Sequence, residues 1–169
     1  DDNEYELYAI ADTALANTGT TDRGLRLGGP DGYHLVARDA SAYDQRGDVE
    51  PLLIDEDGTE YSVAAAMATA GRFEWATVGV AGSKYLNELF SDGAAPTPQN
   101  SVDDENVVLV GRLGVGEGVA DRIALGFAED ADTAAALGEA AGALSRGYET
   151  VRRDYVDSWD DFLADKELP

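Results

Sequence analysis

The clearest strand pattern in the sequence lies in the stretch 106–128, which reads NVVLVGRLGVGEGVADRIALGFA. Its two halves, 106–115 and 119–128, are rich in valine, leucine and isoleucine, residues that are typical of β-strands. Between them lies Gly116-Glu117-Gly118, a short glycine-rich connection of the kind that joins antiparallel strands. This stretch therefore predicts a β-hairpin in a mainly antiparallel sheet.

Further strands are expected upstream of this hairpin. Apolar and polar residues alternate over 73–80 (FEWATVGV) and over 4–11 (EYELYAIA), and this period of two predicts strands. A third strand is expected at 32–38 (GYHLVAR). The stretches 12–29 and 92–105 are rich in turn-forming residues, and they predict loops.

Two short helices are also expected. The stretch 62–70 is rich in alanine, which favours a helix, and Gly71 is a natural stop. Leucines at helical spacing predict a second helix over 83–90 (SKYLNELF), with Ser83 as its N-cap.

The last third of the chain has a helical period. Apolar residues recur every three or four positions, at Leu137, Ala140, Ala141, Leu144, Tyr148, Val151, Tyr155, Trp159, Phe162 and Leu163. Asp130 or Asp132 can cap this helix, and Gly147 is expected to divide it in two. We therefore predict a β-sandwich portion at 1–129, with mainly β structure, and a helical arm or linker at 130–169.

The apolar stripe of the arm needs a surface to cover it. We expect the first half, 137–144, to pack on the β body of this chain, and Trp159, Phe162 and Leu163 to await a partner. An uncovered apolar patch promotes self-association, so we also expect contact between copies through the carboxy-terminal helix.

The charge of the chain is strongly acidic. It carries 34 acidic and 12 basic residues, a net charge of −22, with only two lysines and with 21 aspartates against 13 glutamates. Molar salt reduces the Debye length to about 3 Å and screens the repulsion between such charges. The composition therefore favours a salt-adapted, haloarchaeal-type protein over a generic acidic one, and it excludes nucleic acid as a partner because no basic patch is present. No apolar run reaches the length of a membrane span, so no membrane partner is expected.

No residue is assigned a catalytic, cofactor-binding or metal-binding role. His34 is the single histidine and there is no cysteine, so a zinc site is not expected, and His34 is interpreted as structural rather than as the base of a triad. The acidic clusters 55–58 and 103–105 are interpreted as solvated, with calcium binding as the alternative. The glycines of 111–118 indicate a turn rather than a phosphate cradle.

Aromatic residues offer one further candidate. Trp75, Tyr85 and Trp159 could stack on sugar rings, although aromatics at strand and helix spacing more often belong to the core. Glycoside hydrolysis needs two carboxylates at a defined separation, and the sequence identifies no such pair.

Read in order, these segments resemble the amino-terminal β-sandwich of prokaryotic glucoamylases and glucodextranases, glycoside hydrolase family 15. The resemblance begins with the strand at 5–11 and the turn at 12–19 (DTALANTG), which is similar to that domain's D-x-A-L-x-N-x-G turn. It continues through 31–37, 73–80 and 89–93, although Ala81-Gly82-Ser83 stands where the family has Ser-Asp-Gly. Further similar segments are 106–113 and 123–127 as a closing hairpin, 132–143 as a T-P-x-x-A-L-x-x-A helix, and 159–163 as a linker helix.

The resemblance implies an antiparallel β-sandwich, or its second part, that supports the folding and the cleft of a catalytic (α/α)6 barrel in the same parent chain. The parent would be a glucan 1,4-α-glucosidase type of glycoside hydrolase, and its catalytic glutamates would lie after Pro169. The fragment itself is then not an enzyme. The alternative is a free-standing carbohydrate-binding module, for which an α-glucan would be the partner.

Overall fold

The computed structural model describes residues 6–13, 15, 22–29, 32–39, 53–54, 60–71, 73–91, 95–114 and 122–164. Its elements, in chain order, are β1 (Leu7–Thr13), β2 (Asp22–Gly29), β3 (Gly32–Asp39), β4 (Leu53–Ile54), β5 (Glu60–Tyr61), β6 (Val63–Thr69), β7 (Phe73–Val80), α1 (Lys84–Ser91), β8 (Ser101–Glu105), β9 (Val107–Leu113), β10 (Ile123–Glu129), α2 (Thr133–Arg146) and α3 (Tyr148–Ala164). The predicted class, mainly antiparallel β with helices, is confirmed.

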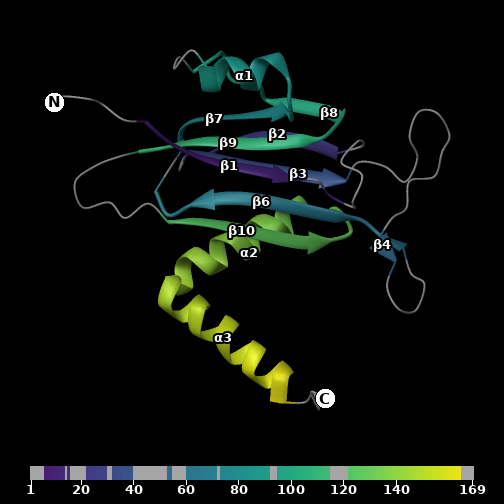
Figure 1. Cartoon of the computed structure of the whole chain (residues 1–169), viewed down its shortest axis with the longest axis vertical. Coiled ribbons are helices and arrows are strands. Elements are labelled where there is room, and N and C mark those ends of the chain that lie inside the picture. The colour runs from purple at the N-terminus through teal and green to yellow at the C-terminus, as the bar shows by residue number, and fades with distance from the viewer. Residues whose placement is uncertain are drawn as a thin grey trace.

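Eight of the described strands form one antiparallel sheet that folds into two layers (Figure 1). One layer contains β1, β9 and β7, and the other contains β10, β6, β3, β2 and β8. The layers are joined where β7 meets β3 at the single pair Tyr33 and Phe73. The result is a sandwich-like body with α1 and α2 on its two outer sides (Figure 1).

Three apolar clusters hold these layers together. Between the sheet layers, Phe73, Leu35, Met67 and Leu109 are almost fully buried. A second cluster lies between the outer face of β3 and β6 and helix α2, and a third lies between β9 and helix α1. Burial of large apolar side chains contributes most to stability, so the central cluster is the main core.

The stretch 62–70 is a strand, β6, and the predicted helix is wrong. Strand β6 lies between β3 and β10, and both of its faces are buried. Ala65 and Met67 face the interior, while Ala64 and Ala66 lie beneath α2. Small side chains allow both neighbouring layers to approach closely, and this packing overrides the helix propensity of alanine.

Two predicted loops also contain strands. Strand β2 lies in the stretch 12–29 and pairs with β3 along its whole length, from Asp22 opposite Asp39 to Gly29 opposite Gly32. Strand β8 lies in the stretch 92–105 and pairs with the other side of β2. Both sequences are poor in strand-forming residues, so pairing with distant neighbours determines their conformation.

The predicted hairpin is wrong in its pairing, although both of its strands exist. Strand β9 pairs with β1 and β7, whereas β10 pairs with β6 in the opposite layer. The connection over 115–121, which includes the predicted turn, lies outside the described residues.

The other local predictions are confirmed. Strands β1, β3 and β7 overlap the stretches 4–11, 32–38 and 73–80, which are expected to be strands, and α1 begins after Ser83, whose hydroxyl accepts a hydrogen bond from the Leu86 amide at 3.3 Å. Asp132 caps α2, and Gly147 divides α2 from α3 with a φ of 79°. The division of the chain into two domains at residue 129 stays a prediction. In the part of the chain that the structure describes, no helix could cross a membrane.

Candidate functional site

The described residues form a pocket of about 400 Å³ at the corner between α2 and α3. It is lined by the start of β10 and by the facing ends of the two helices, through Arg122, Ile123, Ala124, Leu125, Ala143, Leu144, Tyr148 and Val151. Apart from Arg122 and the Tyr148 hydroxyl, the lining side chains are apolar, and none is a carboxylate. The pocket is therefore suited to an apolar group and not to acid–base chemistry.

Hydrogen bonds at both ends of α2 fix the position of the corner between α2 and α3. The Asp132 carboxylate accepts hydrogen bonds from the amides of Ala134 and Ala135, each at 3.0 Å, and fixes where α2 begins. At the other end, the Gly147 amide donates to the Ala143 carbonyl at 3.2 Å. Glycine suits this position because its positive φ is unfavourable for other residues. The chain can therefore turn here and send α3 away from the sheet.

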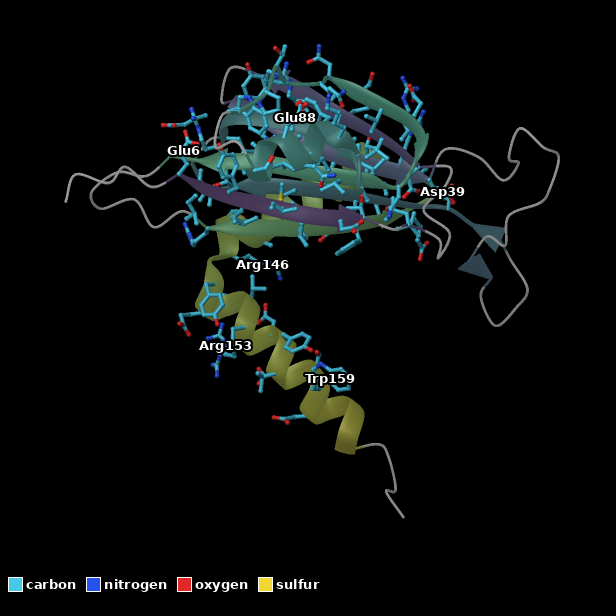
Figure 2. All side chains as sticks on the ribbon, turned by 45° about the horizontal axis from the view of Figure 1, so that its top comes forward. Glu6, Asp39, Glu88, Arg146, Arg153 and Trp159 are labelled. Atoms are coloured by element: carbon cyan, nitrogen blue, oxygen red, sulfur yellow. The ribbon has the colours of Figure 1, made fainter. Side chains whose placement is uncertain are left out.

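Helix α3 projects from the sandwich, with Arg153 and Trp159 on its surface (Figure 2). Its large apolar residues are exposed, with 66% of Tyr148, 62% of Tyr155 and 47% of Trp159 accessible. The Tyr155 and Trp159 rings lie edge to face, with centroids 6.2 Å apart. In the first half of the predicted stripe, 137–144, Ala140 is fully buried and Leu137 packs on the cluster between α2 and the sheet, whereas Ala141 is exposed. The expected contrast between the two halves is confirmed for Leu137 and Ala140 against Tyr155 and Trp159, but not for Ala141, and the side chains of Phe162 and Leu163 lie outside the described residues.

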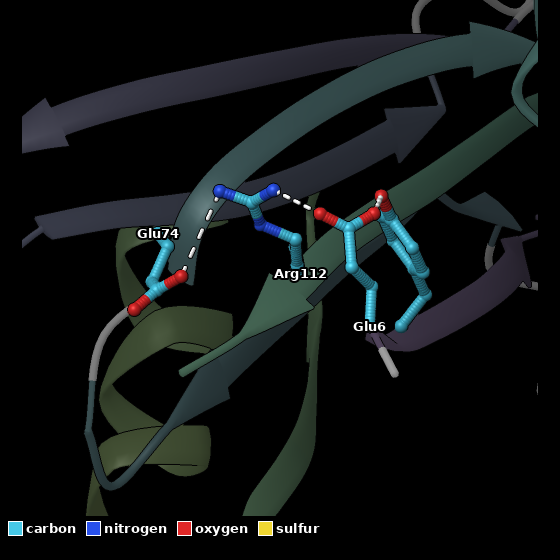
Figure 3. A network of polar contacts seen from close by, with 4 residues as sticks. Glu6, Glu74 and Arg112 are labelled. Carbon is cyan, nitrogen blue, oxygen red and sulfur yellow. Dashed lines mark hydrogen bonds and ion pairs between the residues drawn. The ribbon is translucent and has the colours of Figure 1, made fainter. Parts of the chain in front are cut away.

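A polar network connects β1, β7 and β9 at one end of the layer that these three strands form (Figure 3). The Arg112 guanidinium pairs with Glu6 at 2.5 Å and with Glu74 at 3.6 Å. The Tyr8 hydroxyl donates a hydrogen bond to the second Glu6 oxygen at 2.6 Å. The hydrogen bonds from Tyr8 and from Arg112 lower the pKa of Glu6.

The chemistry of this network is that of a structural contact. A general acid in glycoside hydrolysis needs a raised pKa, and the pKa of Glu6 is shifted in the opposite direction. The sequence analysis missed the network. The available signal was Arg112, a charged residue inside an otherwise apolar strand, and its partners lie 106 and 38 positions away along the chain.

The structure does not bring together the other candidate site residues from the sequence, His34 and the acidic clusters. His34 is half-buried in β3, opposite Leu27 of β2. Asp103 forms an ion pair with Arg23 at 2.8 Å, and the cluster 55–58 lies outside the described residues. Among the residues whose placement is described, no group of three or more acidic, histidine or cysteine side chains could hold a metal ion.

Two of the three candidate aromatic residues, Trp75 and Tyr85, make contacts within this chain. Trp75 lies edge to face with Tyr8, with centroids 6.1 Å apart, and packs in the cluster beneath α1. The Tyr85 hydroxyl is hydrogen-bonded to the Thr77 hydroxyl at 2.7 Å and donates to the Thr97 carbonyl at 3.0 Å. Trp159 is therefore the candidate whose ring remains accessible for a ligand or a partner.

The fold is sandwich-like, and large apolar side chains are exposed on the helix α3 that leaves it. The chain belongs to the family described as glucodextranase, domain N, whose model matches residues 1–164. No curated protein matches the chain in sequence.

Among solved structures, the fold is similar to that of a bacterial glucoamylase complexed with acarbose, with a TM-score of 0.65 and 16% sequence identity. The similarity covers 93% of this chain but only 20% of the glucoamylase chain. At this level of identity the likeness shows the fold alone.

Proposed function

We propose that this chain is a non-catalytic amino-terminal domain of a glucoamylase-type hydrolase of glycoside hydrolase family 15. Its role is to support the folding and the cleft of an (α/α)6 catalytic barrel in the same parent polypeptide. The family membership and the likeness to one fifth of a glucoamylase chain support this proposal.

The observation that carries the proposal is the exposed apolar face of α3. Tyr148 and Tyr155 are more than half accessible, and Trp159 is 47% accessible, on a helix that leads away from the sandwich. Exposure of several large apolar side chains on one helix marks a surface that another domain covers. In this account the barrel is that partner.

A free-standing carbohydrate-binding module is the second candidate, because Tyr155 and Trp159 present accessible aromatic rings that could stack on sugars. These rings lie edge to face and do not form a flat platform, which favours the support role.

A starch pull-down separates the two candidates. In molar KCl, we expect the purified chain to stay in solution when starch granules are sedimented, and Trp159→Ala to give the same result. Retention of the wild-type chain that is displaced by soluble starch and lost in Trp159→Ala would contradict the support role and favour the binding module.

A further inference from the structure

Strand β10 forms an unprotected border of the sandwich. It pairs with β6 on one side, and no strand in the described part of the chain pairs with its other side. Proteins protect such edges with prolines, lysines, inward-pointing charges or bulges. β10 contains no proline or lysine, and its pairing with β6 runs without a register shift from Ile123 to Glu129. The edge strand β8, by contrast, carries three acidic residues and an irregular register.

The side chains of β10 divide into two sets. Gly126 and Ala128 lie against α2. The alternate set, which strand geometry places on the opposite face, is exposed and is apolar except for Glu129 at its end: 43% of Ile123, 49% of Leu125 and 58% of Phe127 are accessible. The edge therefore combines unpaired main-chain groups with apolar side chains, which is the surface that an added strand recognises.

The charges around β10 indicate which strand could pair with its free edge. The strand itself carries one charge, Glu129, in a chain with a net charge of −22. Arg122 precedes the strand and Asp130 follows it. Antiparallel pairing of two copies of β10 about Gly126 places each Arg122 opposite the Asp130 of the other copy. Parallel pairing would bring like charges together.

The same register matches the apolar residues. Leu125 of each copy lies opposite Phe127 of the other, on the face of β10 that points away from α2. Both side chains are about half accessible in the single chain, and this contact would cover them.

We propose that β10 pairs antiparallel with β10 of a second copy of this chain, so that the two sheets continue across a two-fold axis. Each half of the interface is self-complementary, as a two-fold contact requires. Two bodies of charge −22 repel at low ionic strength, and molar salt screens this repulsion. The dimer therefore forms in molar KCl and dissociates as salt is lowered.

Sedimentation velocity of the purified chain in molar KCl tests the proposal. We expect a dimer for the wild type, and a loss of affinity of at least about tenfold in Phe127→Lys, because it places charge in the apolar contact. Ile10→Lys is the matched control, since Ile10 is an equally exposed apolar residue on the edge strand β1, 51% accessible. The melting temperature of each variant shows whether it remains folded.

A charge exchange tests the register independently. Arg122→Glu and Asp130→Arg should each weaken the dimer, whereas mixing the two variants should restore it, because the mixture recreates both opposite-charge pairs. Chains that stay monomeric at all salt concentrations would overturn the proposal. So would a dimer that survives Phe127→Lys, or one that dissociates in Trp159→Ser, which would place the contact on α3.

Discussion

Gly126→Ala is expected to destabilise the chain by about 3 kcal/mol, the upper end of the usual cost of overpacking. A methyl group at position 126 would overlap the carbonyl oxygen of Ala136 and would lie 2.5 Å from the amide nitrogen of Ala140. Both atoms belong to the backbone of α2, so no side chain can rotate away. For a chain of this length the melting temperature should fall by about 10 °C.

Gly138→Ala is the control for this prediction. It makes the same change on α2, where an added methyl group would meet no atom within 4 Å. Alanine is a better helix former than glycine, so this variant should gain up to about 1 kcal/mol. Thermal unfolding, monitored by circular dichroism, measures the melting temperatures of the two variants. A Gly126→Ala variant as stable as the wild type would show that α2 is not seated on β10.

The stability of the chain should rise steeply with salt. A net charge of −22 on 169 residues repels itself in dilute buffer, and screening reduces this cost. If salt removes roughly 3 kcal/mol of repulsion, the melting temperature rises by about 10 °C. We expect the rise to continue above about 1 M KCl, where screening is nearly complete, if the carboxylates are adapted to molar salt.

A charge-reduced variant provides the control for the salt prediction. Asp157 and Asp160 are exposed on α3, and Asp157→Lys with Asp160→Lys changes the net charge from −22 to −18. This variant should show a smaller rise between low and moderate salt. A melting temperature that stays constant from about 0.1 M to several molar KCl would refute the salt-adapted interpretation.

Sequence reasoning succeeded where local signals determine the structure. Strand β7 has the predicted bounds, Phe73–Val80, because its aromatic and β-branched residues favour a strand, although residues 76–79 are all buried and its burial does not alternate. The start of α2 and the break before α3 follow from Asp132 and Gly147, which act on their own neighbours.

Sequence reasoning failed where pairing between segments far apart in the chain determines the structure. The alanines of β6 are strand residues only because β3, β10 and α2 surround them, and β2 depends on β3 and β8. The sequence Gly116-Glu117-Gly118 is typical of a hairpin turn, yet β9 pairs with β1 and β7. No pattern within one segment encodes these choices.

The candidate site shows the same division. The apolar stripe of α3 could be predicted from its spacing, and its exposure at Tyr155 and Trp159 is confirmed. The pocket at the α2–α3 corner and the Arg112 network could not, because each joins residues from separate elements.

We propose that this chain supports hydrolysis by a parent enzyme without performing it. The direct measurement is glucose release from maltose and from soluble starch by the purified chain in molar KCl, with a preparation inactivated by unfolding as the baseline. The account predicts a rate equal to that baseline. Steady glucose release that follows the chain through purification, and that is absent from the unfolded preparation, would contradict it.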